Sequence, residues 1–86
     1  MILTVRKKPV VVEAVLWTGS NWDELVEWCP YGISCMGDNK PINVDTLEGK
    51  MRCEVGDYLI NGVDGEYYPI KKEIFAETYE IVTKGR

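Results

Sequence analysis

Apolar and polar positions along the chain predict a strand, a helix, a series of short strands and a second short helix. Val10–Trp17 is β-branched and apolar on both alternating faces, which predicts a central strand covered on both sides. Met1–Lys8 mixes apolar and basic residues and could form a short opening strand. Asn21 is a candidate N-cap, with Glu24 in capping-box register, for a helix over Trp22–Cys29. The expected apolar stripe of this helix consists of Trp22, Leu25, Val26 and Cys29.

Apolar and polar residues alternate with a period of two through much of the second half of the chain. Ile42–Leu47 and Lys50–Val55 flank Glu48-Gly49 and predict a hairpin with one face in water. A short helix over Lys72–Thr78, burying Ile74 and Phe75, should follow, and then a last strand over Tyr79–Val82. The remaining expected elements are strands at Ile33–Met36, Tyr58–Asn61 and Tyr67–Ile70, and a polar tail at Thr83–Arg86.

These elements predict one α+β domain over residues 1–86. We expect a curved, mainly antiparallel sheet that could close toward a small barrel, with one main helix and one short C-terminal helix. A chain of 86 residues supports only one small core. Three Trp and five Tyr exceed what such a core can enclose, so some rings should lie at an interface or a ligand site.

The charge and the cysteine content limit which binding partners and which cell compartment we expect for this chain. The net charge is −4 and the densest basic run is Arg6–Lys8, which disfavours duplex nucleic acid but leaves room for one small anion. Three cysteines without a C-x-x-C pattern or a signal peptide favour a reducing cytoplasm. No apolar run approaches the length of a membrane span, so no membrane partner is expected.

The absence of histidine removes the most common general base and the usual metal ligand. No phosphate-binding glycine motif occurs either, so we expect no cofactor, no metal and no enzymatic activity. Asp57, Asp64 and Glu66 fall in neighbouring turns and could form a cation site or an acid–base pair. Ordinary turn chemistry explains the same residues and is the favoured interpretation.

Two stretches have the character of a binding site. Lys71 and Lys72 follow two tyrosines at a helix start and could bind an anion, although two solvated lysines explain them as well. Trp17, at a strand end, is either a stacking wall for a planar ligand or a core residue. Trp28 lies off the helix stripe and could make a subunit contact, whereas Trp22 should be core. The candidate ligand-binding residues are Trp17, Thr18, Arg52, Tyr58, Tyr67, Tyr68, Lys71 and Lys72.

Several segments also resemble a family of small proteins found in phages and prophages. The matching segments are residues 8–19, 46–49, 55–63, 65–71, 74–75 and 78–80, and the match is weak over residues 28–41. The hallmark is the Gly-Asp-Tyr turn at Gly56–Tyr58, followed by the Gly-Glu-Tyr-Tyr-Pro strand at Gly65–Pro69. The resemblance implies a phage-related setting in a bacterial host and supplies no catalytic residue.

Three functional hypotheses follow. The first is a non-enzymatic module that captures a small, planar, nucleotide-like anion, as a sponge that counters host defence. The second is a protein–protein inhibitor or adaptor, and the third is an enzyme acting through carboxylates alone. A small core with surplus aromatic residues also predicts a homo-oligomer, with the site inside one subunit or between subunits.

Overall fold

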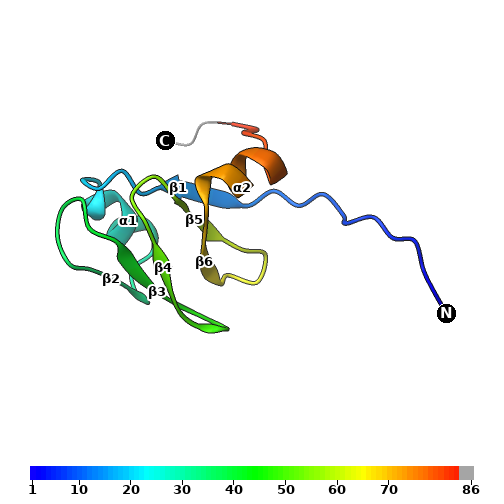
Figure 1. The fold of residues 1–86 in the computed structure, drawn as a ribbon, viewed down its shortest axis with the longest axis horizontal. Helices are drawn as coiled ribbons and strands as arrows, with labels where there is room; N and C mark the ends of the chain where they lie inside the picture. The colour runs from blue at the N-terminus through cyan, green and yellow to red at the C-terminus, as the bar shows by residue number, and fades with distance from the viewer. Residues whose placement is uncertain (84–86) are drawn as a thin grey trace.

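The computed structural model describes residues 1–83, which form two three-stranded antiparallel sheets and two helices (Figure 1). Sheet A has the order β1-β5-β6, and sheet B has the order β2-β3-β4. The elements are β1 (Glu13–Leu16), α1 (Trp22–Trp28), β2 (Ile33–Cys35), β3 (Ile42–Thr46), β4 (Gly49–Cys53), β5 (Tyr58–Asn61), β6 (Tyr67–Ile70) and α2 (Lys72–Thr78). The predicted α+β class is confirmed, and the two sheets do not close into a barrel.

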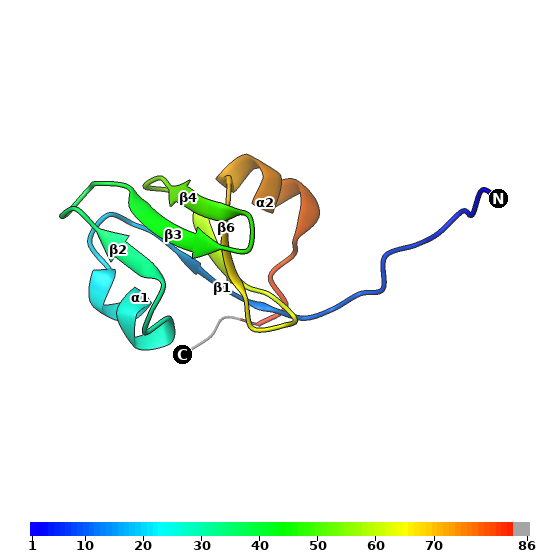
Figure 2. The same cartoon turned by 90° about the horizontal axis from the view of Figure 1, so that it is seen from below.

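The core lies between the two sheets and α1. Its fully buried members are Trp17, Leu25, Cys29, Ile42, Val44, Cys53 and Leu59. Helix α2 lies on the other face of sheet A, so the two helices flank the molecule from opposite sides (Figure 2). Adjacent Leu59 and Ile60 of β5 are both fully buried, because β5 is the middle strand of sheet A and is covered on both faces.

The prediction that Val10–Trp17 is a central strand is wrong. The strand is shorter, Glu13–Leu16, and lies at an edge of sheet A, where it pairs with β5 alone. Val10 and Val11 precede it and are exposed. β-branched composition indicates that a segment favours extended structure, but not how many strands will pair with it.

The strands predicted at the two ends of the chain are also absent. Residues 1–12 form no helix or strand, and Tyr79–Val82 likewise pairs with no strand. Ile81 and Val82 are exposed. Neither segment pairs with the edge of a sheet, so neither forms a strand despite the β propensity of its residues. The predicted tail at Thr83–Arg86 lies outside the described residues beyond Thr83.

The central elements follow the prediction closely. The hairpin of β3 and β4 forms around Leu47 and Glu48, and α2 has the expected bounds. On α1, Val26 is exposed and Trp28 packs against the core in its place. Ile74, expected to be buried, is also exposed, whereas Phe75 is half-buried.

The start of α1 differs from a capping box. Asn21 occupies the N-cap position, but its side chain makes no capping hydrogen bond to the helix. Its Oδ1 instead accepts from the Thr18 N–H at 2.9 Å, and its Nδ2 donates to the Leu16 carbonyl at 2.8 Å. Glu24 accepts from the same amide at 2.7 Å. Asn21 therefore joins the end of β1 to the start of α1.

Candidate functional site

A row of aromatic rings joins α2 to sheet A. Tyr58 of β5 stacks on Phe75 of α2, with centroids 3.8 Å apart and planes 12° from parallel. Phe75 in turn stacks on Tyr79, four residues further along, at 5.3 Å. The hydroxyls of Tyr68 and Tyr79 lie 3.4 Å apart. This hydrogen bond, followed by burial, raises the pKa of Tyr68 to about 12.

An open groove runs beside this row, with a volume of about 830 Å³. We call it the α2 groove. Its lining comprises Leu16, Gly56, Tyr58, Lys72, Glu73, Phe75, Ala76, Tyr79 and Ile81. Most of these side chains are apolar or aromatic, and Lys72 and Glu73 supply one charge of each sign. The lining is therefore suited to apolar side chains better than to a strongly charged group.

Lys71, directly before α2, forms an ion pair that stabilises the fold. Its Nζ lies 3.7 Å from Oδ2 of Asp57, whose side chain is buried while that of Lys71 remains largely exposed. The same Oδ2 accepts a hydrogen bond from the Glu54 N–H at 3.1 Å. Lys71 thus compensates a buried carboxylate, and of the two lysines only Lys72 lines the groove.

Tyr67 and Tyr68, which the sequence placed in one site, lie on opposite faces of sheet A. Tyr67 faces the core and packs edge-on against Trp28, with centroids 5.3 Å apart. Its hydroxyl donates to the Trp28 carbonyl at 3.2 Å, and burial raises its pKa. Tyr68 faces α2. Successive residues of a strand point to opposite faces, so these two rings cannot share a pocket.

Trp17 is a core residue, which corrects the expectation that it could form a stacking wall. Its side chain is fully buried, and its Nε1 donates to the Lys40 carbonyl at 2.8 Å. Stacking requires an accessible ring face, and this ring has none. Thr18 is exposed, but its hydroxyl donates to Oδ1 of Asn21 at 2.9 Å and belongs to the loop before α1.

The two predicted stretches do not contact each other directly, but both contact the turn before β5. The Trp17 N–H donates to the Asp57 carbonyl at 2.9 Å, and the Gly56 N–H donates to the Trp17 carbonyl at 2.8 Å. Asp57 pairs with Lys71, as described above. The turn before β5 therefore connects the end of β1 to the start of α2, and its Gly56 lines the α2 groove.

The remaining candidates lie elsewhere. Arg52 belongs to sheet B, where its exposed side chain lies 3.7 Å from the Glu54 carboxylate. Trp28 is half-buried rather than exposed, because its ring packs on Tyr67 and its Nε1 donates to Glu13 at 3.0 Å. Neither residue lines the α2 groove.

The three candidate carboxylates do not converge. Asp57 precedes β5, whereas Asp64 and Glu66 follow it in the turn to β6. Glu66 accepts from the Asp64 N–H at 2.9 Å, which is the turn chemistry that the sequence favoured. Among residues 1–83, no cluster of three or more His, Cys, Asp or Glu residues could hold a metal ion.

Sequence reasoning missed several groove residues, above all Phe75, Tyr79 and Ile81. Phe75 and Tyr79 are four residues apart, a spacing that places both on one side of a helix and could have suggested a shared aromatic surface. The contribution of Leu16 had no sequence signal, because it depends on where α2 docks.

No protein family, no curated protein and no solved structure matches the chain. The similarity to phage and prophage proteins therefore stays a prediction. In the part of the chain that the structure describes, no helix is both long and apolar enough to cross a membrane.

Proposed function

We propose that the chain is a non-enzymatic binding module and that the α2 groove receives an extended segment of a protein partner. The apolar and aromatic lining of the groove supports this proposal most strongly. Tyr58, Phe75 and Tyr79 are each half-buried, so each ring is held in place while part of it stays accessible. Rigid aromatic rings of this kind give large contact areas for little loss of entropy.

The charges near the groove indicate which segment fits. Helix α2 and the residues that flank it carry Glu73, Glu77 and Glu80 against Lys71 and Lys72, all of them exposed, and Lys71 is already paired with Asp57. A partner segment with apolar side chains and flanking basic residues would complement both the apolar lining and these nearby carboxylates. In a phage setting the partner would be a host or phage protein, and the module an inhibitor or adaptor.

A small, planar, nucleotide-like anion is the second candidate. The observation that favours it is Lys72 beside the accessible ring of Tyr58 in one groove. It is the weaker candidate because Glu73 lies next to Lys72 and Lys71 is paired with Asp57. A phosphate needs several converging donors, and the groove offers one ammonium.

The experiment compares two panels of ligands on one protein. A library of short peptides and a panel of nucleotides, including cyclic nucleotides, are titrated while backbone amide signals are followed by NMR. We expect apolar, basic peptides to bind with micromolar affinity and to shift signals from the groove lining. Binding of nucleotides alone would favour the second candidate, and binding of neither panel would refute both.

Matched variants locate the site. Ile81 and Val63 are both apolar, lie outside helices and strands and are 65% and 63% exposed, but only Ile81 lines the α2 groove. Ile81→Ser should weaken peptide binding about tenfold, because it removes an apolar side chain from the groove lining without adding a charge. Val63→Ser should leave binding unchanged. Equal effects of the two substitutions would contradict the assignment of the groove.

A further inference from the structure

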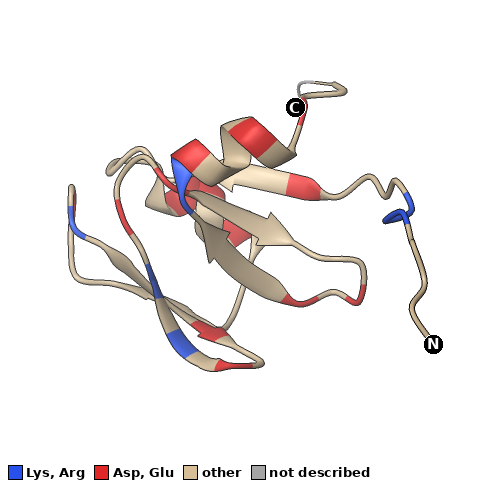
Figure 3. Ribbon diagram, turned by 45° about the vertical axis from the view of Figure 1, so that its right-hand side comes forward, with Lys and Arg blue, Asp and Glu red and all other residues tan. Residues whose placement is uncertain are grey.

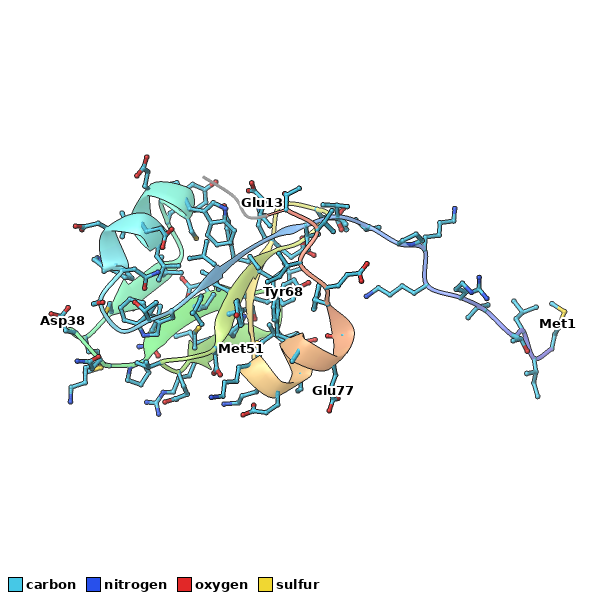
Figure 4. The ribbon with its side chains drawn as sticks, turned by 90° about the horizontal axis from the view of Figure 1, so that it is seen from above. Met1, Glu13, Asp38, Met51, Tyr68 and Glu77 are labelled. Atoms are coloured by element: carbon cyan, nitrogen blue, oxygen red, sulfur yellow. The ribbon has the colours of Figure 1, made fainter. Side chains whose placement is uncertain are left out.

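Residues 1–12 form an extended arm that leaves the body of the molecule (Figures 1 and 2). Every residue from Met1 to Val11 is exposed, including the apolar side chains of Ile2, Leu3 and Val5. Met1 marks the far end of the arm, away from all strands and helices (Figure 4). Exposed apolar side chains in a row are typical of a segment that is buried in an assembly.

The arm and the body have opposite charge. Arg6, Lys7 and Lys8 are the only charged side chains of residues 1–12, which gives the arm +3 and leaves −7 for the rest of a chain whose net charge is −4. Figure 3 shows the basic residues on the arm and acidic residues along α2. The arm thus combines apolar side chains with basic ones, which complement the apolar lining of the α2 groove and the carboxylates of α2.

We propose that the arm of one copy docks in the α2 groove of a second copy, so that two copies exchange arms. This inference rests on the proposed function, because both use the same groove. Each copy offers one arm and one groove, so a twofold pair satisfies both and closes the assembly.

The direction of the arm favours a second copy over its own groove. The arm leaves sheet A at the Glu13 end of β1, whereas Leu16, at the other end of β1, lines the groove. Residues 10–12 lie against the turn at residues 61–63, in a separate groove of about 470 Å³. Pro9 disfavours helix at Lys8, which keeps the arm extended at this point. The nine residues before residues 10–12 span about 30 Å when extended, enough to reach across a neighbouring body.

Charge reversal in the full chain tests the exchange. Lys7→Glu/Lys8→Glu reverses charge on the arm, and Glu77→Lys/Glu80→Lys reverses the charge of two carboxylates that neighbour the groove lining in the sequence. Glu77 points away from the body, so the fold should tolerate this change, as circular dichroism can verify (Figure 4). In sedimentation velocity at micromolar concentrations we expect wild type to dimerise and each variant alone to dimerise at least tenfold more weakly.

An equimolar mixture of the two variants should dimerise again, because both arm–groove contacts are then complementary. A wild-type monomer, dimers that persist in either variant, or a mixture that stays monomeric would overturn the arm exchange. A monomer with a protected Val5 amide would place the arm on its own groove and also overturn it. If wild type is monomeric while the groove still binds library peptides, the proposed function stands and only the exchange fails.

Discussion

At the scale of single residues, Asp57 shows how a candidate catalytic group can instead organise the fold. Among the described residues, Asp57 is the one charged residue that is buried, with 6% of its surface exposed. Its carboxylate accepts the Glu54 N–H and faces Lys71, and its carbonyl accepts the Trp17 N–H. One residue therefore connects the turn before β5 with the end of β1 and the start of α2.

Removing this carboxylate should destabilise the whole domain. We expect Asp57→Ala to lower the free energy of unfolding by about 2 kcal/mol, because it leaves the Glu54 N–H without its acceptor and Lys71 without its partner. Asp45→Ala is the control, since Asp45 pairs with Lys50 on the surface and both side chains are mostly exposed. That change should cost less than about 0.5 kcal/mol in urea unfolding. Similar losses for the two variants would contradict the role of Asp57.

Buried Cys53 should make the fold sensitive to alkaline pH. Burial, followed by the negative charges of Asp57 and Glu54, raises the pKa of this thiol from 9.0 to about 12. The folded chain therefore holds the proton more tightly than the unfolded chain. The resulting stability is complete below pH 9 and is lost as pH rises from 9 toward 12.

The measurement is the urea midpoint as a function of pH across this range. Cys53→Ala should make the decline between pH 9 and 12 less steep, and the part that remains comes from groups whose pKa is also raised by folding, such as Tyr67 and Tyr68. Met51→Ala, on the same strand and without a titrating group, should shift the curve by a constant amount. A decline equally steep in wild type and Cys53→Ala would exclude the thiol as its cause.

At the scale of elements, docking of loops and helices matters more than local propensity. Gly19 illustrates this, since it lies in the loop between β1 and α1 with a φ of +95°. Its carbonyl accepts the Asn39 N–H at 2.8 Å, which joins this loop to the one before β3. Gly19 must therefore adopt a left-handed conformation and also allow close approach of a second backbone.

A pair of substitutions separates these two requirements. Gly19→Ala and Gly49→Ala both place a side chain at positive φ, but a Cβ at Gly19 would lie 2.5 Å from Oδ1 of Asn39, whereas a Cβ at Gly49 meets open space. We expect a loss of about 1 kcal/mol for Gly49→Ala and of at least about 2 kcal/mol for Gly19→Ala. Thermal unfolding of both variants provides the test, and equal losses would show that only the backbone angle matters.

At the scale of the whole molecule, the arm sets the shape. The radius of gyration is 14.0 Å, larger than the roughly 12 Å expected for a compact chain of this length. The longest dimension is 49 Å against 29 and 22 Å for the others. The compact part is therefore small, and a domain of this size gains much from burying surface in an assembly.

If two copies exchange arms, stability should depend on concentration. The midpoint of thermal unfolding of wild type should rise as protein concentration increases, because a dimer that binds only folded chains is favoured by mass action. In Lys7→Glu/Lys8→Glu the midpoint should stay constant over the same range. A concentration-independent midpoint in wild type would argue against a dimer that stabilises the fold.

Local patterns were sufficient to predict most elements, including the hairpin and the bounds of α2. They were less informative about the site. Of the predicted ligand residues, Tyr58 and Lys72 line the α2 groove, whereas Trp17 and Tyr67 face the core. The separation of Tyr67 from Tyr68 follows from strand alternation and could have been predicted from the sequence. The burial of Trp17 could not, because it depends on loops more than twenty residues away.

The sequence by itself determined the order and type of most elements, the turns between them and the opposite charges of arm and body. These properties depend on neighbouring residues, because propensity, alternation and turn chemistry act over a few positions. Only the tertiary structure decided that β5 is central, that β1 is an edge, and that α2 docks on sheet A to form a groove. These depend on pairings between distant segments, which compete for the same strand edges and the same core.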